Sequence, residues 1–188
     1  MKFYSIVIVL MGLLVSCETP TVEPEEEATG MSLETYFDNS GRDDVVSGGI
    51  KLIPVNTPSG TFNVWTKRTG NNPRIKVLLL HGGPGGTHEE WLACDSYFPG
   101  EAIEYYYYDQ LGSYYSDQPD ESTLWRTERF VEEVEQVRKA LGLGPDNFYL
   151  MGQSWGGILG MEYALKYQQN LKGLIISNMM ASCPAYGA

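Results

Sequence analysis

Residues 148–157 have the sequence FYLMGQSWGG, and this stretch decides the fold. Its first four residues form an apolar run typical of a buried strand, and the pattern that follows over residues 155–167 predicts a helix. Gly152 and Gly156 flank Ser154 and leave room for a sharp turn in which the serine adopts a strained backbone conformation. Such a turn lifts the serine hydroxyl off the sheet, beside a helix N-terminus that favours negative charge. The alternative, a structural turn with an incidental serine, does not account for both flanks.

Outward from this turn, strand and helix patterns alternate. The expected strands cover residues 49–55, 61–67, 75–80, 103–108, 148–151 and 174–177, and the expected helices cover residues 89–97, 124–141 and 155–167. The first two strands form a hairpin, and the apolar run IKVLLL over residues 75–80 is typical of a strand covered on both faces. This order predicts an α/β protein with a mainly parallel sheet, helices on both faces, and ligands at the carboxyl ends of the strands.

The helix expected over residues 124–141 has a clear apolar face. That face is formed by Phe130, Val134, Val137 and Leu141. The side chains expected to point away from it are Glu132, Glu133, Glu135, Arg138 and Lys139. Spacings of four, seven and eleven residues from Phe130 place the apolar side chains on one stripe, so we expect the charged set to lie in solvent.

A glycine-rich loop directly follows the strand over residues 75–80. It consists of His81, Gly82, Gly83, Pro84, Gly85 and Gly86. Backbone without side chains can approach a substrate closely and aim amide N–H groups at a developing oxyanion. We expect one such donor from Gly83 and the other from Trp155, the residue after the serine. A phosphate-binding loop is the alternative, but the lysine and the following Ser/Thr of a P-loop are missing.

A third loop, DQLGS over residues 109–113, follows the tyrosine-rich strand expected over residues 103–108. It lies at the same edge of the predicted sheet and carries Asp109 and Gln110. We interpret Asp109 as a structural hydrogen-bond acceptor in a turn-rich loop rather than as a catalytic acid.

Together HGGPGG, DQLGSYYSDQP and GQSWGG, in this order and spacing, resemble the proline iminopeptidases and the related tricorn-associated aminopeptidases. The resemblance spans about residues 50–177. It implies an α/β-hydrolase fold with a helical cap, and release of an N-terminal residue, often proline, from short peptides without metal or organic cofactor. By match to the family's motifs, Ser154 is the nucleophile, Gly83 and Trp155 are the oxyanion donors, and His81 is structural.

The partners that a serine nucleophile needs are missing from the sequence. In α/β-hydrolases an Asp or Glu and then a His follow the serine. After Ser154 there is only Glu162, inside a helix, and no histidine. His88 lies near the glycine-rich loop, where relatives often have a histidine, and is a weak candidate for the base. We therefore expect these 188 residues to be the N-terminal part of a hydrolase domain, inactive alone because the cap and the C-terminal strands are absent.

The N-terminus predicts export. Lys2 precedes an apolar run that ends at Leu14-Val15-Ser16-Cys17, a pattern that resembles the bacterial lipobox. We predict a signal peptide over residues 1–16, a glutamate- and proline-rich tether over residues 17–30, and the hydrolase domain over residues 31–188. Acyl chains on Cys17 would anchor the domain to a membrane surface of the bacterial cell envelope, facing the periplasm or the outside. A plain signal peptide is the alternative.

Charge and cysteine content restrict the remaining possibilities. The net charge of −11 argues against nucleic acid as a partner, because phosphates require a basic face. It suits cationic partners such as peptide N-termini, although a solvated acidic surface is the simpler explanation. An oxidising compartment permits a disulfide between Cys94 and Cys183, but both lie in or beside apolar segments, where buried free thiols are common. Their spacing predicts no metal site.

Two other functions remain open. The same scaffold serves esterases, lactonases and amidases, which act on other small acyl substrates, and a lipoprotein without catalysis would keep the fold for binding. A serine at position 154 argues against dehalogenases and epoxide hydrolases, which use aspartate there.

Overall fold

The computed structural model of the chain describes residues 30–179. The predicted signal peptide, the tether up to Thr29, Cys17 and Cys183 lie outside the described residues. Cys94 is half-buried and forms no disulfide with a described residue, and burial raises the pKa of its thiol. None of the helices within residues 30–179 has the length and apolar character needed to cross a membrane.

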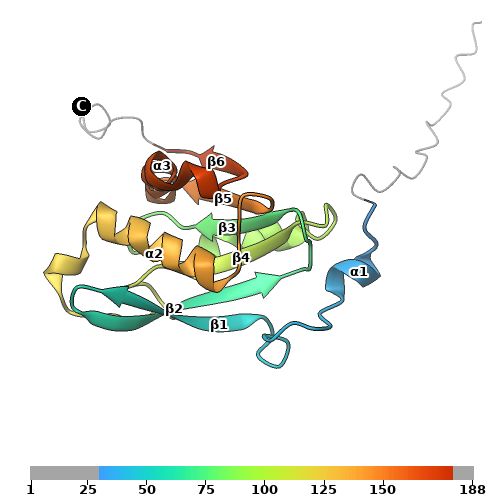
Figure 1. Cartoon of the computed structure of the whole chain (residues 1–188), viewed down its shortest axis with the longest axis horizontal. Helices are drawn as coiled ribbons and strands as arrows, with labels where there is room; N and C mark the ends of the chain where they lie inside the picture. The colour runs from blue at the N-terminus through green and yellow to red at the C-terminus, as the bar shows by residue number, and fades with distance from the viewer. Residues whose placement is uncertain (1–29, 180–188) are drawn as a thin grey trace, which may run out of the picture.

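A six-stranded sheet forms the centre of the described region (Figure 1). Its strands are β1 (Ile50–Thr57), β2 (Gly60–Thr69), β3 (Lys76–Leu80), β4 (Glu104–Asp109), β5 (Phe148–Gln153) and β6 (Gly173–Ser177), in the order β1-β2-β4-β3-β5-β6. β1 and β2 form the predicted hairpin, and β2 is also antiparallel to β4. The other four strands are parallel, so β3, β4, β5 and β6 all end at one edge. That edge carries all three glycine-containing loops.

Helices cover the sheet on both faces. α2 (Thr127–Ala140) and α3 (Trp155–Tyr167) lie side by side on one face, as Figure 1 shows. Their apolar side chains form the larger core with those of the strands, including Leu78, Leu80 and Phe148. The 3-10 helix η1 (His88–Ser96) covers the other face, where Trp91 packs in a smaller core. The fold is the predicted α/β fold with a mainly parallel sheet.

The tyrosine run on β4 shows how one strand serves both cores. Side chains alternate along a strand, so Tyr106 and Tyr108 enter the larger core while Tyr105 and Tyr107 enter the smaller one. Every ring is buried, and every hydroxyl meets a carboxylate: Glu104 for Tyr106, Glu133 for Tyr108, and Asp95 for the other two. Burial is the main cause that raises the pKa of all four hydroxyls. Ordered hydroxyls thus allow a strand of large polar rings to lie inside the protein.

Two expectations about helices were wrong. Glu133 and Glu135 of α2 do not face solvent; they are 1% and 4% exposed. Glu133 accepts hydrogen bonds from Tyr108 and from the Leu111 amide, and Glu135 accepts one from Tyr163, so polar partners in the core compensate for burial.

The bounds of the helices also differ from expectation. α2 begins at Thr127, because residues 122–124 form the separate 3-10 turn η2 (Ser122–Leu124). The expected helix over residues 89–97 is the 3-10 helix η1. Two short elements were not predicted: α1 (Leu33–Phe37) and η3 (Gln168–Asn170). The buried Tyr36 hydroxyl of α1 donates to the Ile103 carbonyl at 2.9 Å, which ties this segment to the sheet.

Candidate active site

Ser154 occupies the turn between β5 and α3 in a backbone conformation that few residues adopt. Its φ is 52° and its ψ is −118°, and a non-glycine residue there is strained by about 1–3 kcal/mol. Gly152 and Gly156 make the turn possible, since a Cβ on Gly152 would collide with the Gly156 carbonyl and one on Gly156 with the Leu80 carbonyl. The Ser154 amide donates to the Ser177 carbonyl at 3.1 Å, which holds the turn against β6.

The serine side chain remains available for chemistry. Ser154 is half-buried, and its hydroxyl hydrogen-bonds none of the described residues. The neighbouring loop passes close by, because a Cβ on Gly82 would lie 3.3 Å from the Ser154 Cβ. A hydroxyl without a partner, beside a loop whose Gly83 amide is free, is the arrangement that an attacking oxygen requires.

The glycine-rich loop leaves the Gly83 amide free. Gly82 donates to the Glu90 carboxylate at 2.6 Å, and Gly86 donates to the Gly82 carbonyl at 3.2 Å. Gly83, with a φ of 118° and a cis bond to Pro84, donates to no acceptor within residues 30–179. The Trp155 amide opens α3, where it has no acceptor in the helix. Both amides predicted as oxyanion donors therefore lack an acceptor among the described residues.

His81 and Gln110 connect the three loops. His81 is fully buried, with Nδ1 2.9 Å from the Gly82 carbonyl and Nε2 accepting from the Gln110 amide at 3.1 Å. These contacts correspond to the neutral ring with its proton on Nδ1, and burial lowers its pKa. The Gln110 side chain donates to the His81 carbonyl at 3.2 Å and accepts from the Trp155 indole at 3.0 Å. His81 thus has no nitrogen free to take a proton from Ser154.

Asp109 and His88 form a separate buried pair. The Asp109 carboxylate accepts from the His88 amide at 2.8 Å and lies 3.0 Å from His88 Nδ1, while the His88 ring packs against the Trp65 ring with centroids 4.5 Å apart. Asp109 ends β4, and β3 separates β4 from β5, so two strand spacings of roughly 4.8 Å lie between the end of β4 and the strand that leads into Ser154. His88 Nδ1 is engaged by Asp109, no hydrogen bond among the described residues joins His88 to Ser154, and Asp109 acts as a local acceptor.

Two other acidic residues differ in their relation to the serine. Glu162 is exposed on α3, two turns beyond Ser154. Glu90 was not identified from the sequence: η1 carries it back against Gly82, where partial burial of its carboxyl raises the pKa although the residue as a whole is exposed. The eight-residue separation from Gly82 offers no signal without knowledge of the tight turn between them. Within residues 30–179, no group of three or more His, Cys, Asp or Glu side chains is placed to hold a metal ion.

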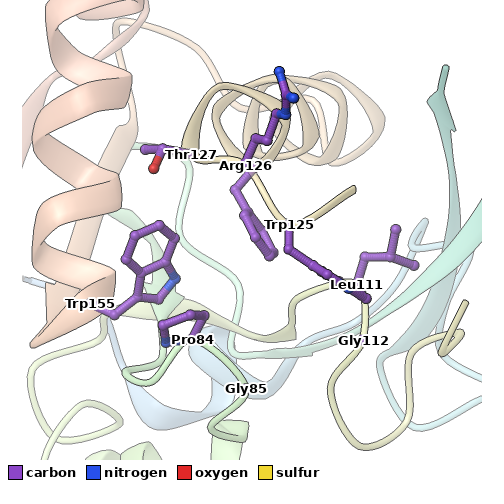
Figure 2. Close-up of a pocket in the computed structure, with 9 residues that line it drawn as sticks. Pro84, Gly85, Leu111, Gly112, Trp125, Arg126, Thr127 and Trp155 are labelled. Atoms are coloured by element: carbon purple, nitrogen blue, oxygen red, sulfur yellow. The ribbon is translucent and has the colours of Figure 1, made fainter. Parts of the chain in front are cut away.

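A cavity of about 390 Å³ opens beside Trp155, the residue that follows Ser154 (Figure 2). It is lined by residues of all three loops together with the start of α2. Pro84 belongs to the glycine-rich loop, Leu111 to the loop after β4, and Trp155 follows the serine, while Trp125 and Phe130 complete the lining. Its walls are mainly aromatic and apolar, as in most small-molecule sites.

Comparison with known proteins gives a family and a set of relatives. The sequence profile of a family described as alpha/beta hydrolase fold matches residues 76–188. A proline iminopeptidase of Flavobacterium johnsoniae is 65% identical over 136 residues, covering 72% of this chain and 46% of the relative. A proline iminopeptidase of Chitinophaga pinensis is 63% identical over 131 residues, covering 70% of this chain and 44% of the relative.

Among solved structures, the crystal structure of the proline iminopeptidase of Mycobacterium smegmatis superimposes with a TM-score of 0.65. It is 29% identical, and the match covers 73% of this chain and 46% of that one. The chain thus spans about half the length of the curated relatives that it matches.

Proposed function

Because this chain belongs to the alpha/beta hydrolase fold family, we propose that Ser154 is the nucleophile of a serine peptidase that releases N-terminal residues, proline above all, from short peptides. The single observation that carries the proposal is the set of unpaired groups at one turn: the Ser154 hydroxyl and the amides of Gly83 and Trp155. The names of the relatives at 63–65% identity support the substrate class.

The proposed reaction begins with attack of the Ser154 oxygen on the carbonyl carbon of the first peptide bond. The carbonyl oxygen becomes an oxyanion that accepts hydrogen bonds from the Gly83 and Trp155 amides. Collapse of this intermediate breaks the C–N bond and releases the rest of the peptide as an amine, leaving an acyl-enzyme that water hydrolyses. His81 and Gln110 hold the loops in place and exchange no proton with the substrate.

The base that accepts the serine proton, and then donates it to the nitrogen of the leaving amine, is part of the proposal as well. The sequence contains two histidines, of which His81 has both nitrogens engaged and His88 belongs to the Asp109 pair. We propose that an acid and a histidine from outside these 188 residues complete the site, so the 188 residues alone do not turn over substrate.

The test uses the full-length product of the gene that encodes this chain. We expect a fluorophosphonate probe to label Ser154 and proline p-nitroanilide to be hydrolysed, with both signals lost in Ser154→Ala. Ser59→Ala, in the exposed turn between β1 and β2, is the matched control and should retain both. Labelling with hydrolysis of simple esters but of no peptide would replace the peptidase by an esterase. Absence of labelling in a folded protein would refute the nucleophile and support a binding role.

For the anchor, we propose that Cys17 carries the lipid that holds the domain to the bacterial cell envelope. The sequence Leu14-Val15-Ser16-Cys17 after a basic start and an apolar run supports this proposal. Metabolic labelling with palmitate should mark the protein and be lost in Cys17→Ala. Unchanged labelling in that variant would remove the proposed lipidation.

A further inference from the structure

The cavity beside Ser154 has walls whose positions are fixed before any ligand enters. The Trp155 indole donates to the Gln110 side chain at 3.0 Å and meets the Phe130 ring edge-to-face at 5.7 Å. The Trp125 ring stacks on Phe130 at 6.3 Å. Gly112 makes room for Trp125, because a Cβ at that position would lie 2.6 Å from the indole. Three aromatic rings therefore form a preformed slot for an apolar group.

The slot adjoins the place where the oxyanion is proposed to form. Pro84 and Gly85, which line it, directly follow Gly83, and Trp155 contributes both the second amide and a wall. Figure 2 shows the Trp155 ring and Pro84 together on one side and Trp125 opposite them. A carbonyl oxygen held by the two amides consequently has the slot on one flank of its carbon. That flank is occupied either by the N-terminal residue or by the residue that leaves.

Charge shows which of the two substrate residues, the N-terminal one or the leaving one, fits the slot. The N-terminal residue carries an ammonium group, which needs a nearby carboxylate once it is removed from water. None of the residues that line the slot is acidic, and the charged one among them is Arg126, whose guanidinium points away from Trp155 in Figure 2. The acidic group close to the serine is Glu90, which lies against Gly82 and outside the slot. An ammonium is therefore unfavourable in the slot, whereas an uncharged apolar side chain is favourable.

We infer that this slot is the subsite for the residue on the leaving side of the scissile bond, and that it selects a large apolar side chain there. The inference rests on the proposed peptidase function and adds a second specificity: the N-terminal residue is chosen elsewhere, and the next residue is chosen by Trp125, Phe130 and Trp155. The substrate class is short peptides whose second residue is leucine, phenylalanine or a similar apolar residue.

The experiment compares dipeptides that share proline and differ in the second residue, with the full-length gene product. We expect kcat/KM for Pro-Phe and Pro-Leu to exceed that for Pro-Gly by roughly 10–100-fold, since a buried large side chain contributes on that scale. Trp125 is 45% exposed, so Trp125→Ala should fold. It should lower the ratio of Pro-Phe to Pro-Gly about tenfold, and Trp125→Phe should restore most of it. Tyr97→Ala, an exposed aromatic outside the slot, is the matched control and should leave the ratio unchanged.

Two results would overturn the inference. One is an unchanged ratio in Trp125→Ala. The other is a change that follows the N-terminal residue, seen when Pro-, Ala- and Leu-p-nitroanilide are compared, which would place the acyl side in the slot.

A binding measurement separates this inference from the proposed function. In a Ser154→Ala background, calorimetric titration should give tighter binding of Pro-Phe than of Pro-Gly, and Trp125→Ala should remove the difference. If fluorophosphonate labelling fails but this difference persists, the nucleophile is wrong and the slot assignment stands. Equal binding of both dipeptides would refute the slot whatever the labelling shows.

Discussion

The two edges of the sheet, at the amino and at the carboxyl ends of its parallel strands, treat polar groups in opposite ways. At the amino edge, Glu104 of β4 is fully buried and accepts from Arg42 at 2.7 Å, from the Asn72 amide at 2.7 Å and from the Tyr106 hydroxyl, with Lys76 at 3.3 Å. At the carboxyl edge of the sheet, the Ser154 hydroxyl and the amides of Gly83 and Trp155 have no partner among the described residues.

This contrast separates polar groups that stabilise the fold from those that can bind a ligand. Buried polar groups in folded proteins are nearly all paired, because an unpaired one costs about 1–3 kcal/mol. The cluster around Glu104 follows that rule and joins the segment before β1 to the sheet through Arg42. The unpaired groups at the other edge collect around one strained serine, which is where a substrate would supply the missing partners.

The largest change in unfolding free energy is expected in the hydrogen-bonded cluster around Glu104. Glu104→Ala leaves the positive charges of Arg42 and Lys76 without their carboxylate, and breaking a buried ion pair costs about 3–5 kcal/mol. We expect the free energy of unfolding of the full-length protein to fall by that amount in urea denaturation. Glu101→Ala, three residues earlier and exposed, should change it by less than about 0.5 kcal/mol. Equal effects of the two variants would mean that the cluster contributes nothing to stability.

The fold was largely predictable because its signals are local. Strands of continuous apolar residues, such as residues 75–80, and the glycine-flanked turn at Ser154 fix the element type without knowledge of the neighbours. The errors arise where tertiary partners override the pattern. Glu133 can be buried because the Tyr108 hydroxyl and the Leu111 amide, which belong to other segments, donate hydrogen bonds to it. The spacing of residues within α2 does not predict these partners.

A smaller change in unfolding free energy, of opposite sign, is expected at Ser154, among the groups without partners. Ser154 has a φ of 52°, a region that glycine enters without the penalty of a Cβ. Ser154→Gly should therefore raise the free energy of unfolding by about 1 kcal/mol while abolishing fluorophosphonate labelling. Ser154→Ala is the matched control, since it removes the same hydroxyl but keeps the Cβ. If glycine is no more stable than alanine at this position, the turn stores no strain.

The positions of the proposed nucleophile and oxyanion donors were more predictable than the contacts of the residues that support them. Gly83, Ser154 and Trp155 were identified by motif, and the structure brings them to one edge. The role of Gln110 as a bridge between His81 and Trp155 depends on the register of β3, β4 and β5, which the sequence does not state. Glu90 lacks any motif.

The smallest predicted change in unfolding free energy is at Glu90. Its carboxylate accepts from the Gly82 amide, directly before the unpaired Gly83 amide. Burial raises the pKa of its carboxyl above 4.5, so the folded protein binds this proton more readily than the unfolded chain. The resulting stability is complete below the unfolded pKa and is lost as the pH rises through the folded pKa. Glu90→Gln remains neutral and keeps an acceptor for the Gly82 amide. It should therefore be slightly more stable than the wild type at pH 7, and this advantage should shrink at pH 4 in urea denaturation.

Glu90→Ala separates the charge from the hydrogen bond. Alanine loses the acceptor for the Gly82 amide, so this variant should be less stable than Glu90→Gln at both pH values. The gain in stability of Glu90→Gln over the wild type could also be the same at pH 4 and pH 7. That result would show that folding does not raise the pKa of the Glu90 carboxyl. In that case Glu90, like Glu104, would act only as a paired hydrogen-bond acceptor that stabilises the fold. The groups without partners would then begin at the Gly83 amide.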